Sequence, residues 1–390
     1  MTIATRHEPR VSLPTADDDH EQIVIRQDKE TGLRFIVAVH STVLGPALGG
    51  MRLKRYPSGL REALDDVMRL ARTMTLKASA AGLDLGGGKA VMIDDGRTAM
   101  RTARLEAAAR VIDSLDGAYI TAEDIGTTTA DMDHIARFTR YVVGQSVANG
   151  GGGDPSPVTA ETVFQAMRRG LAVATGSGDF AGRRVGVIGL GKVGSALAAR
   201  LAKSGAHVIG CDLDSSRCDC LASDHGIEVA PSAEAILATE LDVLAPCAAG
   251  GLIDDALARS IDCRVVAGAA NNPLTDRRVA RTLMEREIVY VPDFLANCGG
   301  LIHVSMEWKS QSLRAGHRPA LAQRRQSLRA RHRPALAQPR EHGASEADLI
   351  AGAMVRLDSA LATAEADGVP PIDVAERQAL ERVEAARAQH

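Results

Sequence analysis

The fold of this chain is decided by the stretch Arg184-Val185-Gly186-Val187-Ile188-Gly189-Leu190-Gly191-Lys192-Val193-Gly194. Its first five residues predict a buried strand, and the glycines that follow lead into a helix predicted over 195–203. A second predicted strand, 207–211, ends at Asp212. A glycine-rich turn between a strand and a helix, followed by a second strand that ends in an acid, is typical of a Rossmann-like dinucleotide-binding fold.

Each glycine of this turn has a predicted role. Gly189 allows the tight turn, and Gly191 lets the pyrophosphate of a cofactor approach the helix N-terminus, where backbone amides and the helix dipole favour anions. Gly194 allows the helix to pack closely on the strand. Lys192 and Val193 lie in the same turn and belong to the predicted cofactor site. The alternative is a glycine loop that binds no cofactor, which the strand and helix around it disfavour.

Asp212 predicts which cofactor binds. Its carboxylate can accept hydrogen bonds from both ribose hydroxyls of NAD, and it would repel the 2′-phosphate of NADP. The sequence therefore favours NAD. Arg217 lies close in the sequence and keeps NADP as an alternative, because an arginine in this region can hold the 2′-phosphate.

Alternating strands and helices continue around this unit from residue 151 to 308, which predicts a parallel sheet with helices on both faces. The glycine- and proline-rich stretch 149–157 is the predicted linker at the start of this domain. The later strands of the domain are predicted at 242–245, 264–267 and 288–291.

The first domain, residues 1–150, is predicted to be a separate α/β unit with a mixed sheet. A helix capped by Ser58 has apolar residues at helical spacing up to Met74. Helical spacing returns in residues 345–390, which we expect to complete this domain. The length of 390 residues fits two domains, and we expect the active site in the cleft between them. Further strands are predicted at 22–25, 33–39 and 118–122, and further helices at 97–115 and 130–138.

Composition excludes several classes of function. The formal net charge of −3 offers no general attraction for nucleic acid or for an anionic membrane, and no apolar run is long enough to span a bilayer. The six cysteines lack zinc spacing and any Cys-x-x-Cys pair, so no metal site is expected. We interpret them as reduced thiols of a cytoplasmic protein. The expected partners are small molecules rather than nucleic acid or membrane.

The catalytic prediction comes from a second glycine-rich stretch, between Lys77 and Lys89. Its glycines are expected to let a ligand approach the backbone closely. Lys89 precedes the apolar run 90–93, which would bury the base of its side chain, lower its pKa and allow it to act as a general base. Lys77 is predicted just past the end of a helix, where its charge could hold a substrate carboxylate. The alternative is a glycine turn with two exposed lysines.

Asp124 ends a short predicted strand, in the corner Glu123-Asp124-Ile125-Gly126-Thr127. An acid at such a position can donate a proton to a substrate in a cleft, or it can cap the next helix. Because a lysine base and a dinucleotide-binding domain are predicted in the same chain, we favour the catalytic role.

One basic segment does not fit the two-domain pattern. Residues 311–325 and 326–340 match at 13 of 15 positions, and residues 309–340 contain nine Lys or Arg and no acid. A basic arm for nucleic acid is one interpretation. We favour a tandem duplication that inserts a mobile loop over 309–344, because two copies are too few for a stacked repeat array and the prolines oppose a continuous helix.

Seven motifs in the same order resemble the glutamate/leucine/phenylalanine/valine dehydrogenase family. The resemblance extends from about residue 20 to 308 and resumes near residue 345. The motifs are Gly45-Pro46-Ala47-Leu48-Gly49-Gly50-Met51-Arg52, Met74-Thr75-Leu76-Lys77, Gly82-Leu83-Asp84-Leu85-Gly86-Gly87-Gly88-Lys89, Thr121-Ala122-Glu123-Asp124-Ile125-Gly126-Thr127-Thr128, Gly153-Asp154-Pro155-Ser156-Pro157-Val158-Thr159, Gly268-Ala269-Ala270-Asn271-Asn272 and Pro292-Asp293-Phe294-Leu295-Ala296-Asn297.

The resemblance implies a reaction and roles for residues. An L-amino acid, water and NAD would give a 2-oxo acid, ammonia and NADH, reversibly, in a homo-oligomeric enzyme of amino acid catabolism. Lys77 would bind the substrate α-carboxylate, Lys89 would activate the attacking water, and Asp124 would transfer protons. Further substrate-site residues would be Leu48, Gly49, Gly50, Met74 and Val304, and further cofactor-site residues would be Thr159, Ala269, Asn271 and Asn297.

One departure from the family pattern bears on the substrate. Glutamate-specific members carry a lysine directly before the glycine pair, and here that residue is Leu48. An apolar side chain cannot offset the desolvation of a second carboxylate, so we expect an apolar amino acid such as leucine, valine or isoleucine. Val304 does not decide against phenylalanine, so a phenylalanine dehydrogenase is the first alternative. An NAD-binding homologue impaired by the basic insertion is the second.

Overall fold

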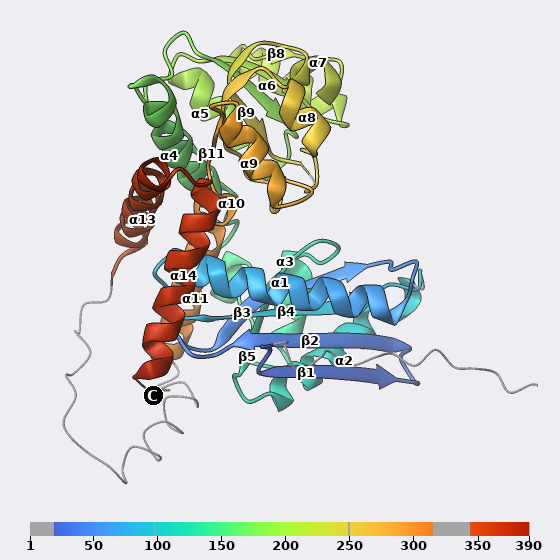
Figure 1. Ribbon diagram of the computed structural model, residues 1–390. Coiled ribbons are helices and arrows are strands. Elements are labelled where there is room, and N and C mark those ends of the chain that lie inside the picture. Colours follow the sequence, from blue (N-terminus) through green and yellow to red (C-terminus); the bar gives the residue numbers. More distant parts are fainter. Residues whose placement is uncertain (1–18, 97, 249, 315–343, 390) are drawn as a thin grey trace, which may run out of the picture.

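The computed structural model describes residues 19–96, 98–248, 250–314 and 344–389. They form two α/β domains, and the C-terminal helices lie along the junction between the two (Figure 1). The expected two-domain α/β architecture is confirmed. Most of the predicted basic insertion, residues 315–343, lies outside the described residues. Among the helices that are described, none combines the length and the hydrophobicity needed to cross a membrane.

The first domain is built on a mixed sheet of five strands, β1 (Gln22–Asp28), β2 (Leu33–Ser41), β3 (Ala47–Lys54), β4 (Gly86–Ile93) and β5 (Tyr119–Glu123). Their order in the sheet is β1-β2-β4-β3-β5. Strand β2 pairs antiparallel with β1 and β4, whereas β3 runs parallel to β4 and β5. The carboxyl ends of β3, β4 and β5 therefore lie at one edge of the sheet.

Helices cover both faces of this sheet, because successive side chains of a strand point to opposite faces. Ile36 and Val91 pack on one face against α1 (Leu60–Ala80). Phe35 and Met92 pack on the other face against the remaining helices of the domain. These are α2 (Arg101–Ser114) and α3 (Thr129–Ile135), and the 3-10 turns η1 (Thr98–Met100) and η2 (Val147–Asn149) lie in the connections.

Two predictions about helix α1 are wrong. The helix begins after Gly59 and has no side-chain cap, so Ser58 is not its N-cap. It also continues to Ala80, which places Lys77 in its last turn rather than beyond its end. The apolar face extends further than expected, since Leu76, Ala78 and Ala80 are all buried.

The triple glycine is the beginning of strand β4 rather than a turn. A Cβ atom on Gly87 would lie 2.1 Å from the backbone nitrogen of Thr75 in α1, and one on Gly88 would lie 2.7 Å from the ring of Tyr119. Both distances are far below the contact distance of carbon atoms. These glycines therefore let a helix and an aromatic ring pack against the strand, instead of the close approach of a ligand that the sequence suggested.

The second domain holds a six-stranded parallel sheet formed by β6 (Arg184–Ile188), β7 (His207–Cys211), β8 (Glu228–Val229), β9 (Leu241–Pro246), β10 (Cys263–Val266) and β11 (Val289–Tyr290). The order is β11-β10-β9-β6-β7-β8. The strand order reverses at β6, which lies between β7 and β9. At such a reversal, α/β sheets bind ligands beyond the carboxyl ends of the strands, and the glycine turn follows β6 directly.

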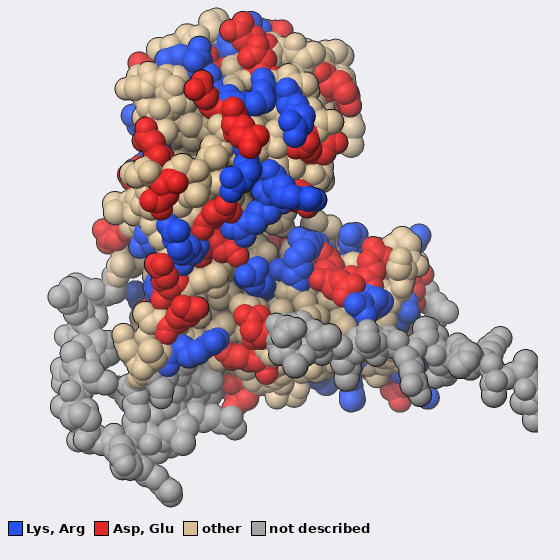
Figure 2. Space-filling model, viewed as in Figure 1, with Lys and Arg blue, Asp and Glu red and all other residues tan. Residues whose placement is uncertain are grey.

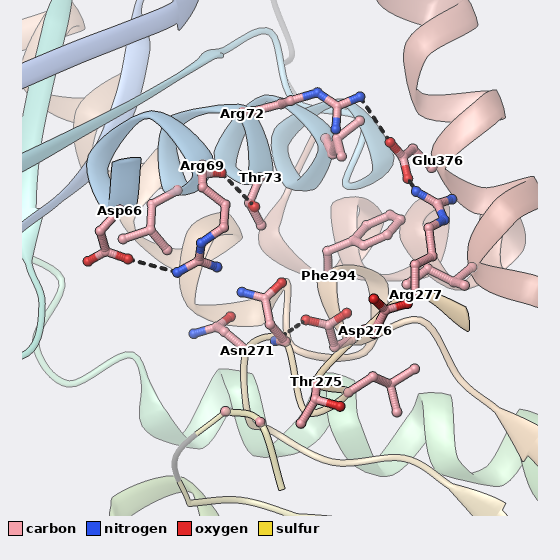
Figure 3. Close-up of a pocket in the computed structure, with 18 of the residues that line it drawn as sticks. Asp66, Arg69, Arg72, Thr73, Asn271, Thr275, Asp276, Arg277, Phe294 and Glu376 are labelled. Atoms are coloured by element: carbon pink, nitrogen blue, oxygen red, sulfur yellow. Dashed lines mark hydrogen bonds and ion pairs between the residues drawn. The ribbon is translucent and has the colours of Figure 1, made fainter. Parts of the chain in front are cut away.

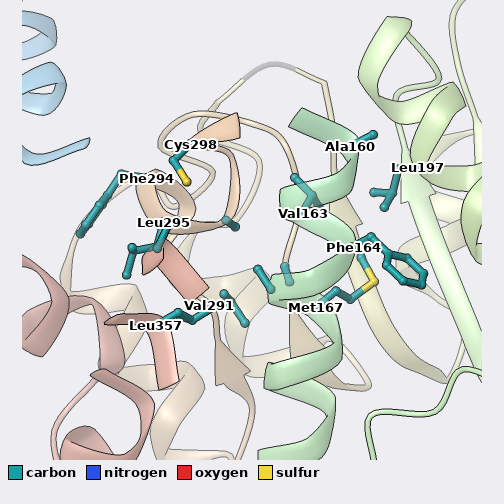
Figure 4. Close-up of a cluster of buried hydrophobic side chains, with 14 of the residues drawn as sticks. Ala160, Val163, Phe164, Met167, Leu197, Val291, Phe294, Leu295, Cys298 and Leu357 are labelled. Atoms are coloured by element: carbon teal, nitrogen blue, oxygen red, sulfur yellow. The ribbon is translucent and has the colours of Figure 1, made fainter. Parts of the chain in front are cut away.

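Helices again cover both faces of the parallel sheet, as predicted. Val163 and Met167 of α4 and Leu197 of α5 belong to the core on one face (Figure 4). Val279 and Leu283 of α9 belong to the core on the other face. The helices of this domain are α4 (Ser156–Thr175), α5 (Lys192–Lys203), α6 (Ser215–His225), α7 (Ala233–Leu237), α8 (Asp255–Ser260) and α9 (Arg278–Glu285).

The last helices contact both domains. They are α10 (Asp293–Ala296), α11 (Gly299–Arg314), α13 (Glu346–Asp367) and α14 (Pro371–Ala388). Helix α14 packs on α1 of the first domain, and α13 packs on α4 of the second. One apolar core consequently runs through the junction and includes Leu76, Met167, Phe294 and Leu357. Residues 309–314, where the basic insertion was predicted to begin, continue helix α11.

A buried carboxylate holds the predicted linker between the domains and the loop just before it. Glu307 of α11 accepts hydrogen bonds from the backbone N–H groups of Gly144 and Gly152, each at 3.0 Å. Its side chain is buried. Nε2 of His303, on the same helix, donates to the carbonyl oxygen of Gly152 at 3.0 Å. Both the N–H and the C=O of Gly152 are therefore hydrogen-bonded to side chains of α11.

Candidate active site

A chain of ion pairs lies at the edge of the first sheet where β3 and β5 end. Nζ of Lys89 lies 3.1 Å from Oδ2 of Asp124, and Nε of Arg52 donates to the same oxygen at 2.8 Å. Nη1 of Arg52 also donates to Oδ2 of Asp66 in α1, at 3.1 Å. The structure thus brings the two predicted catalytic residues together. It adds Arg52, to which the sequence assigned no role.

Asp124 does not cap the helix that follows it. Helix α3 is capped by Thr128, whose side chain accepts the backbone N–H of Asp131. The backbone N–H of Asp124 donates to Oγ1 of Thr127 at 2.9 Å, which fixes the corner after β5. The carboxylate instead contacts two cations, Arg52 and Lys89.

Burial and charge together set the protonation states of this cluster. Lys89 is only 5% exposed, and burial disfavours its ammonium form, so its pKa is lowered; Arg52 acts in the same direction, whereas Asp124 opposes it. Burial alone would raise the pKa of Asp124, but the charges of Lys89 and Arg52 outweigh this and hold that pKa below its usual value. The result is an ionised carboxylate beside an amine that releases its proton more readily than an exposed lysine.

Lys77 joins the first domain to the second. Its Nζ donates to Oδ1 of Asn271 at 3.0 Å, and Nδ2 of Asn297 donates to the same oxygen at 3.0 Å. Burial lowers the pKa of Lys77, and Asp293 opposes that shift. Three predicted site residues from two domains therefore meet at one amide oxygen.

The glycine pair of β3 makes room for the neighbouring side chains. A Cβ atom on Gly49 would lie 1.8 Å from the carbonyl oxygen of Gly88 and 3.4 Å from Cγ of Met74. One on Gly50 would lie 2.8 Å from Cβ of Asp124. Gly49 and Met74, both predicted for the substrate site, thus lie side by side, and Gly50 lies beside Asp124.

The predicted apolar substrate residues are buried in one core. Leu48 is 1% exposed and Val304, on α11, is 8% exposed. They share this core with Ala122 and Leu301, which the sequence did not single out. These four side chains, from β3, β5 and α11, are small or aliphatic, and none of them carries a charge.

The glycine turn after β6 has the geometry predicted for it. Gly189 has a φ of +98°, and a Cβ atom on Gly194 would lie 1.9 Å from the carbonyl oxygen of Gly189. A Cβ atom on Gly191 would meet nothing within 4 Å, and α5 begins there without a side-chain cap. Lys192 and Val193 form the first turn of α5. Uncapped amides at an open helix N-terminus fit a pyrophosphate.

Asp212 follows β7 and faces this turn. Its Oδ2 accepts the backbone N–H of Leu190 at 2.7 Å, and its Oδ1 accepts the backbone N–H of Asp214 at 2.9 Å. Nη1 of Arg217 lies 3.9 Å from Oδ1 of Asp212. The carboxylate is thus held in place beside the turn, with a cation nearby.

The remaining predicted cofactor residues lie at the junction of the domains. Oγ1 of Thr159, in α4, donates to the carbonyl oxygen of Pro155 at 3.0 Å. Nδ2 of Asn297 donates to the carbonyl oxygen of Ala269 at 3.1 Å. Oδ1 of Asn297 is buried, and no donor among the described residues reaches it. This acceptor suits an N–H group of a bound molecule.

A cleft with a volume of about 780 Å³ opens between the domains (Figure 3). At one end, Glu376 of α14 pairs with Arg72 of α1 at 3.1 Å and with Arg277 of the second domain. Lys and Arg side chains gather on the surface where the domains meet (Figure 2). Residues of both domains and of α14 line the cleft, including Arg52, Asp66, Asn271, Asp293, Phe294 and Glu376. Two of these residues contact the predicted site: Arg52 donates to Asp124, the partner of Lys89, and Asn271 accepts a hydrogen bond from Lys77.

No three His, Cys, Asp or Glu side chains among the described residues are grouped so that they could hold a metal ion. The six cysteines all lie in this part of the chain, and none forms a disulfide.

Comparison with known proteins agrees with the geometry. The model of the Glu/Leu/Phe/Val dehydrogenase dimerisation domain matches residues 20–141, and the Glutamate/Leucine/Phenylalanine/Valine dehydrogenase model matches residues 212–388. Leucine dehydrogenase of Thermoactinomyces intermedius is 46% identical over 289 residues, which cover 74% of this chain and 78% of that protein. Valine dehydrogenase of Streptomyces virginiae is 44% identical over 290 residues, or 74% and 81% of the two chains.

Solved structures share the fold. The L-tryptophan dehydrogenase from Nostoc punctiforme has a TM-score of 0.73 at 29% identity, over 95% of this chain and 97% of that chain. The hetero-hexameric glutamate dehydrogenase from Thermus thermophilus has a TM-score of 0.71 at 23% identity, over 95% and 90%. Sequence, fold and site lead to one conclusion: the chain belongs to the glutamate/leucine/phenylalanine/valine dehydrogenase family of oxidoreductases.

Proposed function

We propose that this enzyme catalyses the NAD-dependent, reversible oxidative deamination of an apolar L-amino acid. The observation that carries the proposal is the buried Lys89, which contacts the same oxygen of Asp124 as Arg52 does. Lys77, also from the first domain, contacts Asn271 of the second domain. A buried amine with a lowered pKa beside an ionised carboxylate is the pair that water activation and proton transfer require. In the reaction, the amino acid, water and NAD⁺ give the 2-oxo acid, ammonium and NADH with release of one proton.

Each residue of the cluster has one task in this scheme. Lys77 binds the substrate α-carboxylate and orients the α-carbon. NAD, when bound, accepts the hydride from that carbon. Lys89 takes a proton from the water that attacks the imino carbon, and Asp124 moves protons to and from the substrate nitrogen. The buried position of Lys89 excludes bulk water, which would otherwise stabilise its ammonium form.

Two observations support an apolar substrate. Leu48, the residue before the glycine pair, is buried in a core with Ala122, Leu301 and Val304. A substrate carboxylate in such surroundings would lose its hydration without gaining a partner. The relatives named leucine and valine dehydrogenase favour a branched-chain amino acid. The structural relative named tryptophan dehydrogenase, together with the small pocket residues, keeps an aromatic amino acid such as phenylalanine as the alternative.

The preference for NAD rests on Asp212. Its carboxylate lies beside the glycine turn, where it would meet the ribose hydroxyls and repel a 2′-phosphate. The uncapped N-terminus of α5 and the unsatisfied Oδ1 of Asn297 fit the pyrophosphate and an amide donor of the cofactor, respectively. Arg217 is already close to Asp212 and Asp214, so it is less available to a phosphate.

A substrate panel tests this proposal. The purified enzyme would be given leucine, valine, isoleucine, phenylalanine, tryptophan and glutamate with NAD or NADP, and the formation of reduced cofactor would be followed. We expect the highest kcat/KM with a branched-chain amino acid and NAD. A preference for phenylalanine would support the alternative substrate. Cofactor binding without turnover on any amino acid would mean an impaired homologue and would overturn the proposal.

Self-association is the second part of the proposal. Residues 20–141 match a domain described as a dimerisation domain, and β1 lies at the edge of the first sheet with Ile25 41% exposed. An edge strand with exposed apolar side chains is a ready surface for pairing. Light scattering should give a mass that is a multiple of the 41.1 kDa chain, and a monomer at all concentrations would contradict it.

A further inference from the structure

Arg52 is the centre of the ion-pair chain in the first domain. Its guanidinium group bridges Oδ2 of Asp124 at 2.8 Å and Oδ2 of Asp66 at 3.1 Å, and its side chain is 12% exposed. Asp66 is fixed in turn by the hydroxyl of Tyr56 at 2.8 Å and by Arg69 at 2.7 Å. Arg52 therefore cannot turn away from Asp124 without breaking a second, partly buried ion pair.

Only one oxygen of Asp124 is used in these contacts. Both Arg52 and Lys89 approach Oδ2. Within the described residues, Oδ1 takes part in no hydrogen bond. Two cations on Oδ2 fix the plane of the carboxylate, which leaves Oδ1 as the oxygen that a substrate nitrogen or a water molecule can reach.

The sharing of Oδ2 also limits how strongly Asp124 can bind the ammonium form of Lys89. In a buried Lys–Asp pair, the charge of the carboxylate favours the ammonium form of the lysine and opposes burial, which disfavours that form. Arg52 supplies a permanent second cation to the same oxygen, since a guanidinium group does not lose its proton in proteins. The carboxylate then stays ionised even when Lys89 is neutral.

We propose that Arg52 is a positioning residue that holds Asp124 by Oδ2 and counterbalances the attraction of Asp124 for the ammonium form of Lys89. The proposal rests on the function proposed above, in which Lys89 must be neutral to accept a proton. Arg52 touches neither the substrate nor the cofactor in this role. It acts through Asp124.

The charges around Lys89 agree with this role. The groups that face it are Asp124 after β5, Arg52 on β3, and Asp66 and Lys77 on α1. After burial, which lowers the pKa of Lys89 most, Asp124 raises that pKa, Arg52 lowers it and Asp66 raises it. Removing Arg52 and removing the charge of Asp66 should therefore shift the protonation of Lys89 in opposite directions.

Four variants separate positioning from simple folding defects. Arg52→Met removes the charge and keeps most of the side-chain volume, and Arg52→Lys restores a charge without the bidentate reach. Asp66→Asn removes the anion on the far side of Arg52. Arg104→Met is the matched control, because Arg104 is a buried arginine of the same domain that pairs with Asp95 at 2.7 Å and does not touch Asp124.

Two measurements are made on each variant. The first is the pH dependence of kcat/KM, whose acid limb reports the protonation of Lys89. The second needs no turnover: carbamylation by cyanate, which modifies only the neutral amine, is followed by mass spectrometry at Lys89 across pH. Carbamylation of Lys203, an exposed lysine on α5, is measured in the same samples as the internal reference.

For Arg52→Met we expect the acid limb and the carbamylation midpoint to rise together by about one pH unit or more. This lowers kcat/KM about tenfold at a pH below the limb. The acid limb and the carbamylation midpoint should both fall in Asp66→Asn, return towards the wild-type values in Arg52→Lys and stay unchanged in Arg104→Met. An unchanged midpoint at Lys89 in Arg52→Met, or an equal shift in Arg104→Met, would overturn the role of Arg52. If no amino acid is oxidised, the proposed function fails, while the carbamylation midpoints still decide the role of Arg52.

Discussion

Replacing Glu307 tests whether the linker between the domains is held by hydrogen bonds to a single carboxylate. In Glu307→Ala the buried N–H of Gly144 loses its acceptor, which costs about 1–3 kcal/mol. The N–H of Gly152 loses one as well, but Gly152 is exposed and water can replace the bond, so only about 0.5–1.5 kcal/mol is lost there. We therefore expect a destabilisation of about 1.5–4.5 kcal/mol.

Differential scanning calorimetry measures this loss. At roughly 2–4 °C per kcal/mol, Tm should fall by roughly 3–18 °C. Glu307→Gln should lose less than Glu307→Ala, because a carboxamide oxygen at the position of Oε2 still accepts from both Gly144 and Gly152. The bonds that Oε1 accepts from Gln145 and Gln311 are lost in both variants. Glu285→Ala is the control, since Glu285 is an exposed residue at the end of α9, and it should stay within about 0.5 kcal/mol of wild type. If Glu307→Ala melts with the wild type, or Glu307→Gln is as unstable as Glu307→Ala, the reasoning is refuted.

Three further predictions concern the proposed reaction. Lys89→Ala should lower turnover by about 10²–10⁴-fold, the usual contribution of a general base, with little change in NAD affinity, and single-turnover rates within tenfold of wild type would reject the base role. In the wild type, kcat/KM should decline as the pH falls through the lowered pKa of Lys89. Asp212→Ser should weaken NAD binding by about 1.5–3 kcal/mol and reduce the preference over NADP, and a constant ratio of kcat/KM for the two cofactors would place the ribose contact elsewhere. Leu48→Lys should damage leucine and valine oxidation and introduce activity on glutamate, because a buried lysine needs a carboxylate partner; unchanged leucine kinetics would mean that Leu48 does not contact the substrate side chain.

The second domain could be predicted closely because its signals are local. Strands Arg184–Ile188 and His207–Cys211 lie at the predicted positions, since an apolar run and a glycine turn determine both. The first domain was harder. Strand β3 contains Gly49 and Gly50, and β4 begins with three glycines. Glycine disfavours strands in isolation, and only the packing of α1 and Tyr119 against these strands explains its presence.

The site shows the same division between local and distant information. Lys89, Asp124 and Lys77 could be chosen from their own surroundings and from family resemblance. Arg52 could not, because its partner Asp124 is 72 residues away in the sequence and the pairing depends on β3 and β5 being neighbours. A useful signal was present nonetheless: Arg52 follows five apolar or glycine residues of β3, and an arginine in such a strand needs an anion nearby.

The hydrogen bond between Lys77 and Asn271 has a consequence for the order of events in the cleft. Under the proposed role of Lys77, a substrate carboxylate must compete with Oδ1 of Asn271 for the same ammonium group. The substrate carboxylate therefore has to replace the hydrogen bond from Lys77 to Asn271 of the opposite domain. A hydrogen bond to a charged group contributes about 1.5–3 kcal/mol. Once displaced, Asn271 would keep its bond from Asn297 and gain a free lone pair. Substrate binding would thus break the hydrogen bond that Lys77 makes between the domains and leave Oδ1 of Asn271 able to accept a bond from the cofactor. Binding of the substrate and binding of the cofactor would be coupled in this way.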